Sequence, residues 1–81
     1  MITKVIRLSS IDDIKRFIVE VTKCAFDVDL SSGRYLVDAK SIMGIFSLDL
    51  KVPVKVIMHT DDEHECAAFY DFLTRLTDEP G

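Results

Sequence analysis

Apolar residues recur along the chain at two different periods, and the longer period predicts two amphipathic helices. Residues 11–24 carry apolar side chains at steps of three and four, which gather on one helical face: Ile11, Ile14, Phe17, Ile18, Val21 and Cys24. Ser9 or Ser10 offers an N-cap for this helix. A last helix is expected to open at 60–63, where capping residues precede acidic ones, and its apolar stripe is Cys66, Phe69, Tyr70, Leu73 and Leu76. The chain after it, residues 77–81, is expected to be a frayed tail.

The shorter period, an alternation of apolar and polar side chains, predicts four β-strands. The first covers residues 2–8 and the second covers 26–30. A Ser-Ser-Gly turn then leads into a third strand over 34–38, so that the second and third strands form a hairpin. The fourth strand covers 54–58 and follows a connector, 49–53, that ends in a proline without the amide a central strand would need.

A short helix is expected at 41–47, between the hairpin and the last strand, because Ser41 can cap its first turn. The element order is therefore β-α-β-β-α-β-α. The apolar stripes of the long helices need a partner, and alternating strands offer one apolar sheet face. We predict a single α+β domain over residues 1–81. It has a four-stranded antiparallel sheet, three helices on one face and a second face open to solvent.

Composition and charge exclude several classes of function. The chain has 81 residues and a net charge of −4, which argues against a nucleic-acid partner because such proteins carry a basic stripe. No apolar run approaches the roughly 18–20 residues of a membrane span, and the N-terminus lacks a signal-peptide pattern, so we expect no membrane contact and a cytoplasmic protein. Cys24 and Cys66 are expected to be reduced and half-buried on helices, and no metal or other cofactor is expected.

The run VDAKSIMGIFSL, residues 37–48, closely resembles the regulatory-serine segment of HPr, the phosphocarrier of the bacterial sugar phosphotransferase system. The specific part of the pattern is Lys-Ser-Ile-Met-Gly followed by Ile-Phe-Ser-Leu, at 40–48. The match runs without a gap from Phe26 to about Met58, and the predicted element order is also that of the family. The resemblance implies the HPr fold, an open-faced β-sandwich.

The chain departs from this family at the start of the first helix. HPr proteins carry their phosphorylated histidine in a Gly-x-His-Ala-Arg-Pro segment, whereas residues 8–13 here read LSSIDD. Ungapped alignment places Ser10 at the histidine, Asp12 at the arginine and Asp13 at the proline. A serine phosphate is far less labile than a phosphohistidine, and two carboxylates would repel the phosphoryl group. We therefore expect neither histidine phosphotransfer nor enzymatic activity.

Neither histidine of the chain is expected to replace the missing one. His59 belongs to the last strand and His64 to the first turn of the last helix. In an HPr-like fold the phosphorylated histidine lies near the end of the last helix, so His64 would sit at the opposite end of the molecule. Both are expected to be polar residues that face solvent.

Ser41 has two interpretations, and the sequence leaves both open. Its hydroxyl can cap the short helix, which is worth about 1 kcal/mol. The resemblance also implies a regulatory phosphoserine, and a phosphate there would meet the positive end of the helix dipole and unpaired amides.

The short helix carries more apolar side chains than it can bury. Leu48 is the best candidate for the core, whereas Ile42, Met43 and Phe46 are expected to form an exposed patch of the kind that marks a binding surface. The resemblance implies protein partners for this helix: enzymes of the sugar system, the kinase that modifies the serine and a transcriptional regulator. Carried over by residue, these contacts fall on Lys40, Ser41, Ile42, Met43 and Phe46.

The sequence thus favours an HPr-like regulatory or binding protein that recognises a partner through residues 40–48 and is controlled at Ser41. One alternative is an unconventional phosphoryl carrier, for which Ser10 is the only placed candidate. A second alternative is an HPr-like domain used for scaffolding or oligomerisation.

Overall fold

The element order predicted from the sequence is the order in the structure. The computed structural model describes residues 1–77. The part of the predicted tail after Thr77 lies outside the described residues. The elements are β1 (Ile2–Ile6), α1 (Ile11–Thr22), β2 (Val28–Ser32), β3 (Tyr35–Asp38), α2 (Ile42–Phe46), β4 (Val54–Met58) and α3 (Glu63–Thr74).

Several boundaries differ from the sequence-based ones, and the hairpin shows why. β2 starts at Val28 instead of Phe26 and continues to Ser32, where it pairs with Tyr35. The turn is therefore centred on Gly33, which has a φ of +57°, and not on the preceding serines. Only a glycine enters this left-handed region without a steric cost, so its position fixes the centre of the turn.

The boundaries of the two long helices also differ from those that the periodicity predicts. α1 stops at Thr22 and is followed by the C-cap Lys23, so Cys24 lies just beyond the helix. α3 begins after the N-cap Asp62, whose carboxylate accepts from the amides of His64 and Glu65. Thr60 lies outside the helix, and its hydroxyl donates to the Glu65 carboxylate at 2.7 Å. Asp62 is therefore the N-cap of α3.

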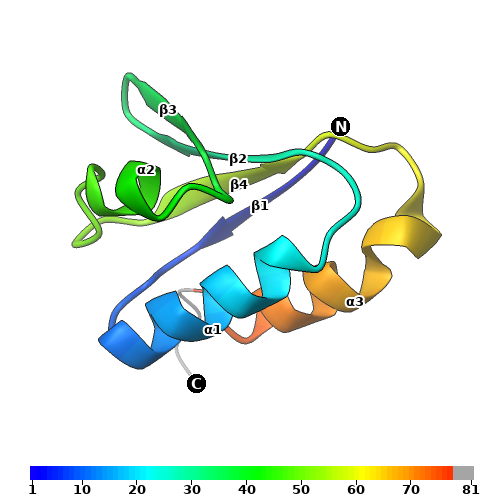
Figure 1. Cartoon of the computed structure of the whole chain (residues 1–81), viewed down its shortest axis with the longest axis horizontal. Coiled ribbons are helices and arrows are strands. Elements are labelled where there is room, and N and C mark those ends of the chain that lie inside the picture. The colour runs from blue at the N-terminus through cyan, green and yellow to red at the C-terminus, as the bar shows by residue number, and fades with distance from the viewer. Residues whose placement is uncertain (78–81) are drawn as a thin grey trace.

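The four strands form one antiparallel sheet in the order β1-β4-β2-β3. Figure 1 shows α1 and α3 side by side below the sheet, with α2 beside β3. A side chain at Gly44 of α2 would lie 3.2 Å from the Cβ of Val37. Val37 pairs with the buried Leu30, which points to the helices. All three helices therefore cover one sheet face, as predicted for the open-faced β-sandwich.

The core lies between this sheet face and the helices. β4 alternates buried and exposed side chains, with Val54, Val56 and Met58 turned inward. From the helices, Phe17 and Phe69 meet with ring centroids 5.9 Å apart. Burying each of these large side chains contributes about 1.5–3 kcal/mol. On the other face, Thr3, Val5, Leu36 and Lys55 are exposed, which confirms that this face is open.

Candidate functional site

Local hydrogen bonds fix where the short helix α2 begins and ends. Ser41 is extended, with φ −98° and ψ 114°, and its Oγ accepts from the Gly44 amide at 3.2 Å. At the other end, the Ser47 hydroxyl donates to the Gly44 carbonyl at 2.6 Å. Both serines act as caps, so the helix is Ile42–Phe46 instead of the predicted 41–47. The structural interpretation of Ser41 as an N-cap is confirmed.

One side of α2 is held against the protein. Ile45 is fully buried and Leu48, just after the helix, is 7% exposed, which confirms Leu48 as a core residue. A Cβ on Gly44 would lie 3.2 Å from the Cβ of Val37 and 3.3 Å from the Asp38 carbonyl oxygen. The helix backbone thus approaches β3 as closely as a glycine allows, and the remaining side of α2 faces solvent.

The solvent side of α2 carries three large apolar side chains. Met43 is 81% exposed, Phe46 is 59% exposed and Ile42 is 52% exposed. The exposure predicted for these three residues is confirmed, and we refer to them as the α2 patch. Their role in binding stays a prediction.

Lys40, which was predicted to contact a partner, is engaged within the protein. Its ammonium group donates to the Cys24 carbonyl at 2.9 Å, and the side chain is half-buried. Its backbone amide donates to the Asp38 carboxylate at 2.9 Å. Lys40 therefore positions the segment that leads into α2, a role for which the sequence carries no signal.

The start of α1, where the resemblance places Ser10 at a phosphorylated histidine, is a helix cap. Ser10 is extended, and its Oγ accepts from the Asp13 amide at 3.1 Å. The Asp13 carboxylate accepts in turn from the Ser9 hydroxyl at 3.1 Å and from the Ser9 amide at 3.3 Å. This reciprocal capping satisfies helix-end donors. Within residues 1–77 the Ser10 hydroxyl makes no hydrogen bond to a carboxylate or a histidine.

A hollow of about 630 Å³ lies between this helix start and the segment after α2. Ser9 and Ser10 line it on one side, and Leu48 to Lys51 line it on the other. Arg7 also lines it and donates to the Lys51 carbonyl at 3.3 Å. Sequence reasoning did not anticipate this contact, because it joins segments that are 44 positions apart.

The start of α3 and the end of β4, which carry the two histidines, lie at the other end of the molecule from the start of α1 (Figure 1). His64 is exposed in the first turn of α3, and His59 is exposed just after β4, which confirms that both face solvent. His59 Nε2 also lies 2.7 Å from an Asp29 carboxylate oxygen. The register of β2 against β4 brings these two residues together.

Both cysteines are free thiols, and neither is activated. Cys66 is 2% exposed, and burial raises its pKa. Desolvation also raises the pKa of the half-buried Cys24, although Lys40 acts in the opposite direction. A raised pKa keeps a thiol protonated and unreactive at neutral pH. Within residues 1–77 no group of three or more His, Cys, Asp or Glu side chains is placed to hold a metal ion.

No helix in the described part of the chain is long and apolar enough to span a membrane. No protein-family model and no curated protein matches the sequence.

Two solved structures are similar over nearly the whole chain. The HPr-C-His protein of Thermoanaerobacter tengcongensis superposes with a TM-score of 0.70 and is 24% identical. The match covers 100% of this chain and 100% of that chain. The phosphocarrier protein HPr of Bacillus anthracis str. Ames superposes with a TM-score of 0.68 and is 21% identical over 94% of this chain and 96% of that chain. This agreement in topology and in extent shows that the chain has the HPr fold.

Proposed function

We propose that this protein is a recognition protein on the HPr fold, which binds a protein partner through the α2 patch and does not transfer phosphoryl groups. The observation that carries the proposal is the exposure of Ile42, Met43 and Phe46 on one side of a helix whose other side is fixed. Large apolar and aromatic side chains on a rigid element are typical anchors of protein interfaces. The HPr-type partners are components of the sugar phosphotransferase system, an HPr-type kinase and a transcriptional regulator.

The geometry at the start of α1 supports recognition over phosphoryl transfer. The Ser10 hydroxyl accepts the amide hydrogen of Asp13, so it already serves as a cap. Asp12 and Asp13 add negative charge in the first turn, where an incoming phosphoryl group would be repelled. Among the described residues, the hollow beside Ser10 is lined by two basic ones, Arg7 and Lys51, but by no histidine, so it lacks the nucleophile that HPr-type transfer uses.

In this proposal Ser41 controls binding. Its side chain lies next to the α2 patch, and its backbone amide donates to the Asp38 carbonyl at 3.0 Å. A phosphate there would add a charge of about −1.5 to −2 directly beside an apolar surface. Burying that charge in an apolar interface is costly, so phosphorylation of Ser41 would weaken an apolar contact with the patch.

Binding of purified partners tests the proposal. The probes are the first enzyme of the sugar phosphotransferase system and an HPr-binding transcriptional regulator, each measured by calorimetry. Replacing Met43→Asp together with Phe46→Asp is expected to weaken binding at least about tenfold. The control is Leu36→Asp, because Leu36 is 62% exposed but lies on the open sheet face, away from α2. Unchanged affinity in the patch variant, or an equal loss in the control, would refute recognition through α2.

A further inference from the structure

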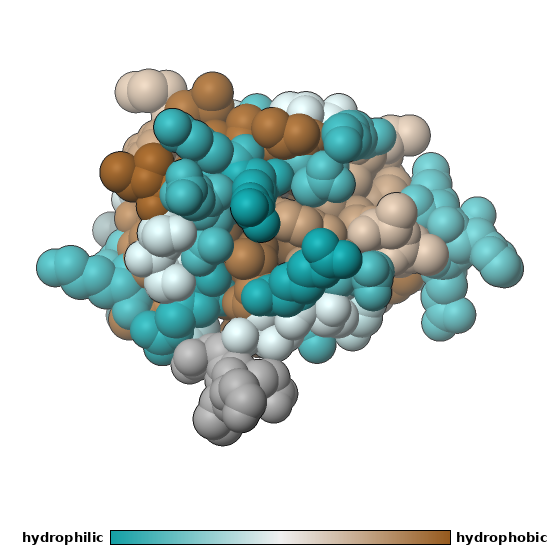
Figure 2. Space-filling view, turned by 90° about the horizontal axis from the view of Figure 1, so that it is seen from below, coloured by the Kyte–Doolittle hydropathy of each residue, from teal (hydrophilic) through white to brown (hydrophobic). Residues whose placement is uncertain are grey.

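A groove with a volume of about 470 Å³ lies between α1 and α3, on the side of these helices that faces away from the sheet. Residues from both helices form it, among them Arg16, Val19 and Glu20 of α1, Ala68 and Phe72 of α3, and Arg75 just after α3. Figure 2 views the molecule from this side and shows apolar atoms between hydrophilic side chains in the middle of the face. The groove shares no residue with the α2 patch.

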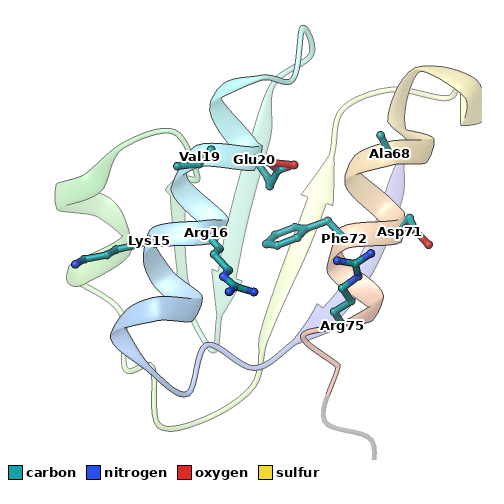
Figure 3. A pocket seen from close by; sticks show the side chains of 8 residues that line it. All are labelled: Lys15, Arg16, Val19, Glu20, Ala68, Asp71, Phe72 and Arg75. Carbon is teal, nitrogen blue, oxygen red and sulfur yellow. The ribbon is translucent and has the colours of Figure 1, made fainter.

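The apolar wall of the groove is the ring of Phe72, which packs against a second aromatic ring on its inner side. Phe72 is half-buried, and its ring stacks on Phe69 with centroids 6.4 Å apart and an interplanar angle of 25°. Phe69 in turn contacts Phe17 of the core. In Figure 3 Phe72 reaches from α3 toward α1. A fixed ring of this kind offers a surface on which a flat apolar group can stack.

Arg16 of α1 and Arg75, the C-cap of α3, line the groove from opposite sides, and within the described chain neither guanidinium group makes a hydrogen bond or an ion pair. In the view of Figure 3 their guanidinium groups lie on either side of the Phe72 ring. Each has a carboxylate four positions away, which is the usual partner on a helix surface. Arg16 has Glu20 and Arg75 has Asp71.

In the described part of the chain neither carboxylate pairs with its arginine, although both line the groove. The Glu20 carboxylate accepts from Lys23 at 2.8 Å. The Asp71 side chain points away from α1 in Figure 3. Lys15 also points away from α3, so the two guanidinium groups and the ring dominate the middle of the groove. Two unpaired like charges beside one cavity attract an anion.

We infer that this groove binds a small organic anion, a carboxylate or a phosphate monoester that carries a flat apolar group. The anionic end binds to the guanidinium groups of Arg16 and Arg75, whose planar forks match carboxylate and phosphate oxygens. The flat group stacks on Phe72. The volume falls in the range of small-molecule sites, about 300–1,000 Å³.

Phenyl phosphate is a suitable probe because it has both required parts. Amide NMR spectra of the whole protein are recorded during titration with phenyl phosphate, with phenol and with inorganic phosphate. We expect saturable shifts around Arg16, Phe72 and Arg75 with phenyl phosphate, and at least about tenfold weaker binding of phenol and of inorganic phosphate. No saturation below about 10 mM phenyl phosphate would overturn the inference. Equal affinity for inorganic phosphate would overturn the assignment of an organic anion.

Charge-removing variants test the residues. Arg16→Gln combined with Arg75→Gln is expected to weaken phenyl phosphate binding at least about tenfold. Both side chains are exposed, so the variant should fold, and its thermal midpoint checks this. Arg34→Gln is the control, since Arg34 is exposed in the β2–β3 turn outside the groove. An unchanged affinity in the double variant would contradict the inference. A phosphotyrosine peptide that binds tenfold more tightly than phenyl phosphate would instead indicate a protein ligand and overturn the small-molecule assignment.

Discussion

The Lys40 ammonium nitrogen lies 2.9 Å from the Cys24 carbonyl oxygen, to which it donates a hydrogen bond across 16 positions of sequence. The last turn of α1 has no basic residue of its own. The C-cap is Lys23, and Lys40 adds a second positive charge just beyond the C-terminal end of the helix, where such a charge is favourable. The same bond ties the segment before Ser41 to the end of α1, so α2 is positioned from both β3 and α1.

Replacing Lys40→Met keeps most of the aliphatic side chain and removes this bond. Because the Cys24 carbonyl loses a charged donor at a half-buried position, the free energy of unfolding is expected to fall by about 1–2 kcal/mol. Urea unfolding followed by circular dichroism measures the change. Lys15→Met is the matched control, since Lys15 is exposed and points away from α3, and it should stay within about 0.5 kcal/mol. Equal stability of the two variants would show that the bond contributes nothing.

The sequence predicted the parts of this site that depend on neighbouring residues. The N-caps Ser10 and Ser41 follow from local chemistry, because a serine before an apolar-periodic segment offers its hydroxyl to free amides. The exposure of Met43 and Phe46 follows from counting, since a helix of this length has only one buried side.

Contacts that depend on how distant segments meet were not predictable in this way. Lys40 reaches Cys24 only because the segment between β3 and α2 lies beside the end of α1. The groove at Arg16 and Arg75 exists only because α1 and α3 lie side by side, and nothing in either helix alone indicates that Glu20 and Asp71 leave these arginines unpaired. The shift of the turn to Gly33 did have a signal, since a glycine in a short hairpin loop marks the position that takes a positive φ.

Gly44→Ala is expected to destabilise the protein although alanine is the better helix former. The gain in helix propensity is up to about 1 kcal/mol. The added Cβ would lie 3.2 Å from the Val37 Cβ and 3.3 Å from the Asp38 carbonyl oxygen, and neither atom belongs to the flexible end of a side chain. Moving α2 away from β3 would therefore cost more than the gain, and we expect a net loss of about 1 kcal/mol. Thermal unfolding decides the sign of the change in stability. A higher midpoint in the variant would show that α2 and β3 adjust to the added Cβ at little cost.

Burial of Cys66 predicts a pH dependence of stability in the alkaline range. Since burial raises the pKa of this thiol in the folded state, the folded protein holds the proton at pH values where the unfolded chain releases it. The contribution to stability is therefore complete below the unfolded pKa of about 8.5 and is lost as the pH rises through the folded pKa. The free energy of unfolding should fall more steeply above about pH 8.5 in the parent protein than in Cys66→Ala. Parallel pH profiles of the two proteins would contradict this.

A comparison of two serines separates capping at Ser41 from regulation there. Ser10→Ala and Ser41→Ala each remove a hydroxyl that accepts from a helix amide, at 3.1 Å and 3.2 Å. Each should lower the free energy of unfolding by about 1 kcal/mol, as measured by urea unfolding. The two variants are then incubated with ATP and an HPr-specific kinase. If Ser41 is the regulatory residue, Ser41→Ala loses the label and Ser10→Ala keeps it, although the loss of stability is the same. Equal destabilisation of the two variants would mean that the difference in label does not come from unfolding. An unlabelled parent protein, or a label that survives in Ser41→Ala, would leave Ser41 with its capping role alone.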